Sequence, residues 1–223
     1  VLFRSQGIDS HKLSTRKILR DQLPGLVTAH RKIKNYSHHL SHAAAGFQTS
    51  PFDRATVVVI DAIGEWDTIS IWGAEYDAKG QARYQRLWRQ IYPHSIGLFY
   101  SAVTARIGLK PMDEEYITMG MAAWGRNTWY QSMREHVIDH ERDIRLQRNF
   151  HTGMSDDFLA HASDENIAAA GQMVVEDLIR LVMIRARNLG FSSNLVYMGG
   201  VALNCTANRR SEEHTSELQS RET

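Results

Sequence analysis

The chain has 223 residues, of which 43% are apolar and 23% are charged, a globular composition that excludes collagen-like, coiled-coil and disordered proteins. A single cysteine, Cys205, excludes an internal disulfide, and no apolar run approaches the roughly 18 residues needed to span a membrane. From the cysteine count and the lack of such a run we expect a cytoplasmic protein. The formal net charge of +1 supplies no general attraction to nucleic acid or anionic lipid, so the function is expected to depend on a local site.

Both ends resemble translated sequencing adapter. Residues 2–5 read LFRS, and residues 210–220 read RSEEHTSELQS. We therefore expect adapter scars at 1–5 and 210–223, flanking a natural segment at 6–209 that is itself a fragment. The alternative for the second segment is an ordinary solvated, charged C-terminus.

The first half of the natural segment predicts one short helix and three strands. Residues 38–46 are good helix formers between a cap at Ser37 and a glycine at Gly46. Residues 55–62 form a β-branched run and residues 67–77 an alternating run, which together predict a β-hairpin, and residues 82–92 predict a third antiparallel strand. Such a meander needs helices packed on it.

The second half predicts mainly helices. Residues 95–108 have a cap at Ser95, a 3.6-residue apolar period and a stop at Gly108. Further helices are expected at 113–124, with Tyr116, Met119 and Ala123 inward, at 129–139, and at 163–189. Residues 195–198, LVYM, predict a short buried strand before Gly199, Gly200 and another helix. The whole order indicates an α/β fold.

Three histidines lie in the first predicted helix. His38 and His42 are one turn apart on the same face, which suits two imidazoles that bind one metal ion, whereas His39 points about 100° away. Asp61 interrupts the apolar run VVVIDAI, where a carboxylate is expected to be paired or to bind a ligand. The alternatives are a solvated histidine face and an aspartate that forms a turn.

Two further segments are candidate binding elements. The turn that contains Gly64, Glu65 and Thr68 offers backbone N–H groups and a carboxylate to a phosphate and metal complex, or is only a hairpin turn. The glycine pair permits close backbone approach, and the helix start that follows it favours an anion such as a phosphate. A glycine pair alone is a weak signal. The predicted nucleotide-binding residues are Gly199, Gly200, Val201 and Asn204.

Four segments together resemble the NodU/CmcH carbamoyltransferases. They read HHLSHAAAGFQTSPF, DAIGEWDT, PHSIGLFYSAVTARIGLKPMDEEYITMGMAAWG and VYMGGVALNCTANR. The resemblance implies an incomplete Kae1-like domain of the actin, Hsp70 and sugar kinase (ASKHA) superfamily. It also implies two steps: a separate C-terminal YrdC-like domain makes carbamoyl adenylate from carbamoyl phosphate and ATP, and the present domain transfers the carbamoyl group to a hydroxyl at a metal site.

The resemblance assigns the metal ligands to His38, His42 and Asp61, with iron or zinc favoured over magnesium. A fourth, aspartate ligand is expected beyond the end of the chain. Two positions depart from the family pattern: Ala62 replaces a usual glycine, and Ile117 replaces a frequent lysine. The second departure limits any transfer of substrate class. No catalytic acid or base is identified.

The expected partners are a small-molecule hydroxyl acceptor and the missing YrdC-like domain, with no membrane and no nucleic acid. One alternative is a threonylcarbamoyl-transfer protein for tRNA modification, and a phosphotransferase of the same superfamily is a weaker one. The non-enzymatic alternative is a nucleotide- or metal-binding module without turnover. We expect the 223-residue fragment itself to be inactive.

Overall fold

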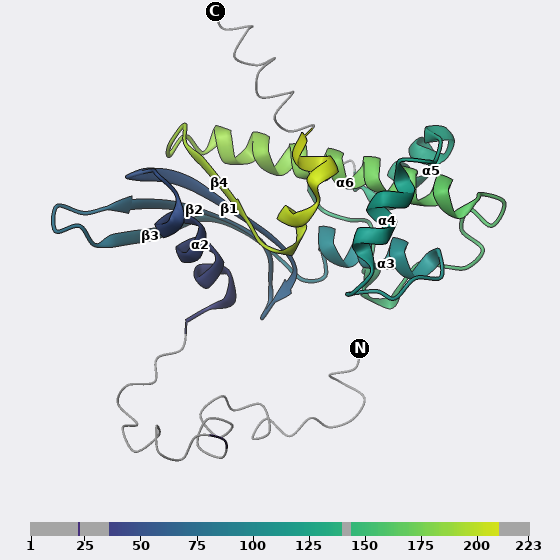
Figure 1. Ribbon diagram of the computed structural model, residues 1–223, viewed down its shortest axis with the longest axis horizontal. Coiled ribbons are helices and arrows are strands. Elements are labelled where there is room, and N and C mark those ends of the chain that lie inside the picture. The colour runs from purple at the N-terminus through teal and green to yellow at the C-terminus, as the bar shows by residue number, and fades with distance from the viewer. Residues whose placement is uncertain (1–21, 23–35, 140–143, 210–223) are drawn as a thin grey trace, which may run out of the picture. The chain divides into compact units, whose positions relative to one another are not determined.

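The computed structural model describes residues 22, 36–139 and 144–209 (Figure 1). The chain divides into two units, residues 1–37 and 38–223, and the fold described below belongs to the second unit. The two predicted adapter segments lie outside the described residues.

A four-stranded mixed sheet forms the centre of this unit. Its strands are β1 (Arg54–Gly64), β2 (Asp67–Tyr76), β3 (Ala82–Ile91) and β4 (Leu195–Met198), in the order β3-β2-β1-β4. The first three strands form the predicted antiparallel meander, and β4 pairs with β1 in parallel, with Val59 opposite Met198. The α/β prediction is confirmed.

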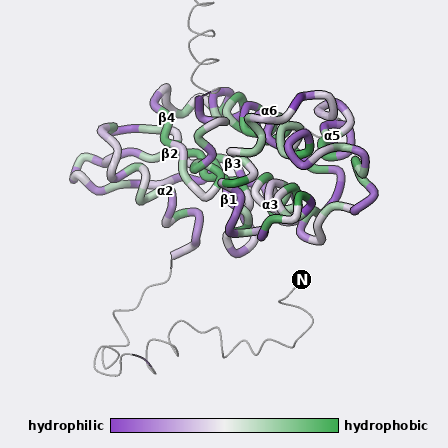
Figure 2. The backbone as a smooth tube through the Cα atoms, turned by 45° about the vertical axis from the view of Figure 1, so that its right-hand side comes forward, coloured by the Kyte–Doolittle hydropathy of each residue, from purple (hydrophilic) through white to green (hydrophobic). Residues whose placement is uncertain are grey.

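Helices cover both faces of the sheet (Figure 1). Helix α2 (His38–Thr49) packs on one face, where Ala43 and Phe47 meet Val57 and Val59 of β1. Val58 and Ile60 face the opposite way, into a larger core with α3 and α6. This alternation places successive β1 side chains in different cores. Figure 2 shows the apolar stretches along the strands and α3.

The remaining helices follow the predicted order. They are α3 (Ile96–Arg106), α4 (Glu115–Ala122), α5 (Tyr130–Val137) and α6 (Asp164–Asn188), with short 3-10 turns η2 (Asn127–Trp129), η3 (Phe150–Thr152) and η4 (Gly200–Leu203). Residues 205–209 are also helical, as predicted for the segment after the glycine pair. The predicted cap at Ser95 is confirmed, because its side chain accepts a hydrogen bond from the Leu98 amide. Helix α6 begins as predicted after Ser163, whose side chain accepts a hydrogen bond from the Asn166 amide. None of the described helices combines the length and apolar character that crossing a membrane requires.

Two details of the predicted helices are wrong. Helix α2 continues past Gly46, because that glycine is a packing position: a Cβ there would lie 2.5 Å from Cγ of Met198. In α4, Tyr116 is 67% exposed, and Ala123 just after the helix is exposed, whereas the buried residue is Thr118, whose hydroxyl forms a hydrogen bond with that of Thr104 at 2.8 Å. Of the three residues predicted to face inward, only Met119 packs against the larger core, so the apolar spacing was wrong for Tyr116 and Ala123.

Strand β4 is also less buried than predicted. Leu195 is 47% exposed, and its three neighbours in the strand are half-buried. Among the described residues β4 pairs only with β1, so one of its edges has no strand beside it. An apolar run of four residues cannot distinguish a central strand from such an end strand.

Candidate metal centre

His38, His42 and Asp61 converge on one point. Nε2 of His38 lies 2.7 Å from Oδ2 of Asp61, Nε2 of His42 lies 3.2 Å from the same oxygen, and the two nitrogens are 3.1 Å apart. The side chains of His38, His42 and Asp61 are 45%, 31% and 17% exposed. The cluster is thus accessible from solvent.

Local packing explains this convergence. Residues 38 and 42 share one face of α2, and the apolar contacts of α2 with β1 hold that face near the end of the strand. Gly64 provides the space, since a Cβ there would clash with the rings of both His38 and His39. Of the three residues predicted for the turn, Gly64 is the one that contacts a candidate ligand ring.

The two oxygens of Asp61 have different partners. Oδ2 faces the histidines, whereas Oδ1 accepts hydrogen bonds from the amides of Ala62, at 2.9 Å, and Gly200, at 3.4 Å. Burial alone would raise the pKa of this carboxyl group. The hydrogen bonds from His38 and Ala62 and the charges of the two histidines outweigh burial, so the pKa of Asp61 is lowered. The carboxylate is held ionised and oriented.

His39 turns away from the cluster, as its angular offset predicts. The ring is buried, and its Nδ1 lies 2.7 Å from Oγ of Ser70, which also accepts the indole N–H of Trp72 at 2.7 Å. Burial lowers the pKa of His39 and favours the neutral ring. His39 therefore anchors α2 to β2, a role that the sequence pattern did not indicate.

The glycine loop reaches the same site from the other side. Gly199 has a φ of 97°, and a Cβ there would clash with the carbonyl oxygen of Ile60, so only glycine fits beside β1. Gly200 follows, and its amide meets Asp61. Of the predicted loop residues, these two are the ones that line the end of β1.

The other two predicted loop residues face the interior. Val201 packs against the larger core. Asn204 is buried and exchanges two hydrogen bonds with the amide of Gln172, at 2.9 and 3.0 Å, while its oxygen also accepts the amide of Ala207. Tyr100 donates to Gln172 at 2.7 Å, so a buried polar network fixes the end of the loop. Sequence reasoning missed Gln172, which no local pattern marks.

The remaining turn residues have structural roles. Thr68 is fully buried, and its hydroxyl donates to the carbonyl of His94 at 2.6 Å, so it ties β2 to the segment before α3. Glu65 is exposed with a φ of 59°, a left-handed turn conformation. Ser95, identified only as a helix cap, also donates to the carbonyl of Ala62 at 2.5 Å and thereby ties α3 to the segment after Asp61.

The donor set of the cluster fits a transition metal. Zinc–nitrogen bonds of about 2.0–2.1 Å at tetrahedral angles place donor atoms about 3.3 Å apart. The three donors here are already separated by 2.7 to 3.2 Å. Two imidazoles and one carboxylate suit zinc or iron better than magnesium, which prefers oxygen ligands and water. Among the described residues, His38, His42 and Asp61 form the group of His, Cys, Asp or Glu side chains whose ligand atoms all lie within 4.8 Å of one another.

Comparisons with known proteins agree with the resemblance. Residues 11–216 match the family model described as carbamoyltransferase N-terminus. The chain is 35% identical to protein sll1178 of Synechocystis sp. over 195 residues, which cover 78% of the chain and 31% of that protein. It is 27% identical to protein MJ1058 of Methanocaldococcus jannaschii over 209 residues, covering 83% and 34%.

A third relative has a descriptive name. The chain is 26% identical to nodulation protein NolNO of Sinorhizobium fredii over 228 residues, covering 93% of the chain and 32% of that protein. The chain thus spans about a third of the length of the relatives that it matches.

Proposed function

This chain belongs to the carbamoyltransferase N-terminus family, and from that premise we propose that it forms part of a metal-dependent O-carbamoyltransferase. The proposed reaction transfers a carbamoyl group from carbamoyl adenylate to a hydroxyl of a small molecule or saccharide. The acceptor oxygen bonds to the carbamoyl carbon, the bond from that carbon to the phosphate oxygen breaks, AMP leaves, and the hydroxyl proton passes to a base or to water.

The convergence of His38, His42 and Asp61 is the observation that carries the proposal. These residues would hold the metal, with an aspartate from outside the chain as a fourth ligand. A bound divalent ion supplies Lewis acidity toward the carbamoyl carbonyl or the adenylate phosphate. Oδ1 of Asp61, held by two backbone amides, fixes the direction in which Oδ2 faces the histidines.

The glycine loop supports binding of the adenylate beside this cluster. The side chains of Val201 and Asn204 face inward and the Gly200 N–H already donates to Asp61, so what the loop offers a nucleotide is close approach to the backbone at Gly199 and Gly200. Backbone N–H groups near the start of a helix favour a phosphate. Proximity of the two elements would place the carbamoyl group next to the metal ligands.

We propose the wider architecture on the same basis. A sheet in the order β3-β2-β1-β4, with an antiparallel meander and one parallel strand, is compatible with a half of the actin, Hsp70 and sugar kinase fold. The activating YrdC-like domain and the hydroxyl acceptor are the proposed partners.

The test is a transfer assay in a protein of the relatives' full length that carries this segment. Labelled carbamoyl adenylate is supplied with zinc or iron(II) and a panel of hydroxylated acceptors. We expect labelled product that disappears with a chelator and in the His38→Ala variant, while the variant of exposed His161, His161→Ala, retains transfer. Labelled product that survives both chelation and His38→Ala would contradict the metal-dependent mechanism, and failure with every acceptor would contradict transfer itself.

A further inference from the structure

A row of paired residues leads from the metal ligands across the sheet to β3. Gly64 of β1 pairs with Asp67 of β2, and Asp67 pairs with Ile91 of β3, so the three residues lie side by side on one face. Paired Cα atoms in antiparallel strands lie about 4.5–5.5 Å apart, so the row is about 10 Å long. We propose that this row binds the hydroxyl acceptor, an inference that rests on the proposed function.

The row begins at the metal centre. A Cβ at Gly64 would lie 2.4 Å from Cδ2 of His38, so the ring of this candidate ligand packs directly against the first residue of the row. The row also lies on the face that α2 covers, because Ser70, which pairs with Arg89 of β3, contacts His39 of α2. A molecule bound on the row would therefore reach the metal ligands without crossing the sheet.

The middle of the row supplies hydrogen-bond donors. Asp67 is buried, and its two carboxylate oxygens accept from Arg86 at 3.3 Å and from Arg89 at 3.4 Å. A guanidinium group has five N–H donors, and these contacts use one nitrogen of each arginine. Both arginines are exposed, so their further N–H groups can donate to the oxygen atoms of a ligand.

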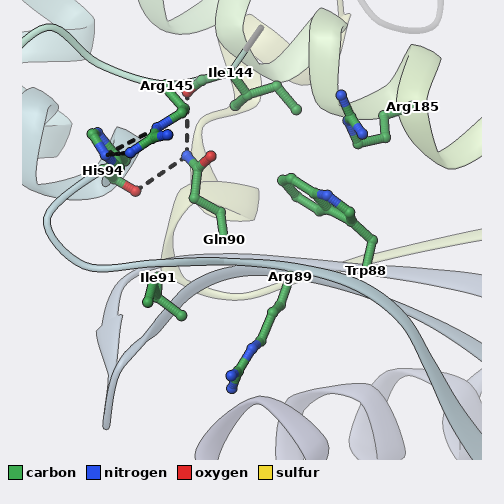
Figure 3. Close-up of a pocket in the computed structure, with 8 residues that line it drawn as sticks. All are labelled: Trp88, Arg89, Gln90, Ile91, His94, Ile144, Arg145 and Arg185. Atoms are coloured by element: carbon green, nitrogen blue, oxygen red, sulfur yellow. Dashed lines mark hydrogen bonds between the residues drawn. The ribbon is translucent and has the colours of Figure 1, made fainter. Parts of the chain in front are cut away.

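The far end of the row is apolar. Ile91 is 46% exposed, and Figure 3 shows it with Arg89 on the side of β3 opposite to Trp88. Trp66, which is 67% exposed, is held beside it, because the amide of Tyr92 donates to the carbonyl of Trp66 at 2.9 Å. Apolar side chains beside a few N–H donors suit a ring that has an apolar face and several hydroxyl groups.

The order of the strands assigns the row to the acceptor instead of the adenylate. In the order β3-β2-β1-β4, the row extends from the end of β1 toward β3, whereas the glycine loop follows β4 on the other side of β1. Asp61 of β1 lies between them. An acceptor on the row and an adenylate at the glycine loop would thus approach the metal ligands from opposite sides, which transfer between two bound molecules requires.

Binding is tested on the 223-residue chain labelled with ¹⁵N, with zinc present. The indole signal of Trp66 is assigned with Trp66→Phe and followed during titration with methyl β-D-glucopyranoside, with cyclohexanol, which lacks the further hydroxyl groups, and with glycerol, which lacks the ring. We expect the glucoside to shift the signal saturably, and the other two to bind at least threefold more weakly. Absence of a saturable shift with the glucoside, or equal binding of all three, would overturn the proposal.

Variants show whether the named side chains bind the probe. Arg89→Ala and Ile91→Ala are each expected to weaken binding of the glucoside at least threefold. The matched controls are Arg83→Ala, at the opposite end of β3, and Ile184→Ala, on the exposed side of α6, which should bind as the parent does. Thermal melts check that each variant is folded. Folded Arg89→Ala and Ile91→Ala variants that bind as tightly as the parent would refute the row as a binding site.

Kinetics in a protein of the relatives' full length separate this inference from the proposed function. In Ile91→Ala we expect the KM for the acceptor to rise at least threefold, while the KM for the adenylate and the affinity for zinc change less than twofold. Transfer with an unchanged acceptor KM would contradict the row and leave the proposed function standing. Absence of transfer in the parent, together with glucoside binding that depends on Arg89, would contradict the proposed function and leave the binding site standing.

Discussion

The amide of Gly200 lies 3.4 Å from Oδ1 of Asp61, although 139 positions separate the two residues. The parallel pairing of β1 and β4 produces this contact, because the carboxyl ends of parallel strands meet at one edge of a sheet. Asp61 consequently joins the histidine pair to the glycine loop, with one carboxylate oxygen for each. We therefore expect a substitution in the glycine loop to alter metal binding at the histidine pair, and a substitution of Asp61 to alter the loop.

Removal of any candidate ligand should strongly weaken metal binding. In His38→Ala, His42→Ala and Asp61→Ala we expect the affinity for zinc to fall by about 100-fold or more, since even residues that only support metal ligands contribute about 10–100-fold. Isothermal titration calorimetry of the 223-residue chain measures the affinity, with His161→Ala as the control. Zinc binding of parent strength in two or more of the ligand variants would show that the metal binds elsewhere.

Substitution of Gly199 should mainly lower the stability of the fold, whereas substitution of Gly200 should mainly lower the affinity for zinc. Gly199→Ala places a side chain at a φ of 97° against the carbonyl of Ile60, so we expect loss of about 2 kcal/mol or more in the free energy of unfolding. Gly200→Val instead places its Cβ 3.0 Å from Oδ1 of Asp61, so zinc affinity should fall with a smaller loss of stability. Urea denaturation and calorimetry of both variants distinguish these effects, and the reverse order would contradict the assigned roles.

Two helix glycines provide a matched pair for packing. A Cβ at Gly46 would lie 2.5 Å from Cγ of Met198, whereas nothing lies within 4 Å of a Cβ at Gly120 in α4. Gly46→Ala is therefore expected to destabilise the fold by about 1–3 kcal/mol through overpacking. Gly120→Ala should stabilise it by about 0.5–1 kcal/mol, because alanine favours the helix. Equal changes in the urea midpoint of both variants would rule out the packing explanation.

Burial of His39 should make stability depend on pH. Its folded pKa is lowered from 6.5, so below pH 6.5 the unfolded chain takes up a proton that the folded chain does not. The free energy of unfolding should then fall as the pH decreases from about 6.5 toward the lowered pKa. Unfolding in a chelator at pH 7.5 and pH 5.5 measures the difference, which should be smaller in His39→Gln than in the parent and unchanged in His161→Gln. An unchanged pH dependence in His39→Gln would contradict a neutral, buried His39.

Features that depend on neighbouring residues in the sequence were predictable. The meander follows from a β-branched run and an alternating run, and the start of α3 follows from the cap at Ser95. The approach of His38 to His42 follows from the helical repeat. Each of these signals arises within one element, so no knowledge of the tertiary structure is needed to find them.

Features that depend on distant partners were not predictable in the same way. Gly46 reads locally as a stop but is required by Met198, and Tyr116 reads as an inward residue although α4 buries Thr118 instead. The inward direction of Asn204 is set by Gln172 on α6. In each case the deciding contact lies on another element, which a local pattern does not record.

The pairing of β1 with β4 also bears on the order of assembly. The histidine pair and Asp61 are separated by about 20 positions and depend on α2 and β1, whereas β4 and the glycine loop follow more than 130 positions later. Contacts between near neighbours close faster than distant ones, and synthesis proceeds from the N-terminus. On the ribosome, the three candidate ligands can therefore meet before the glycine loop has been synthesised, and arrival of β4 completes the surroundings of Asp61 last.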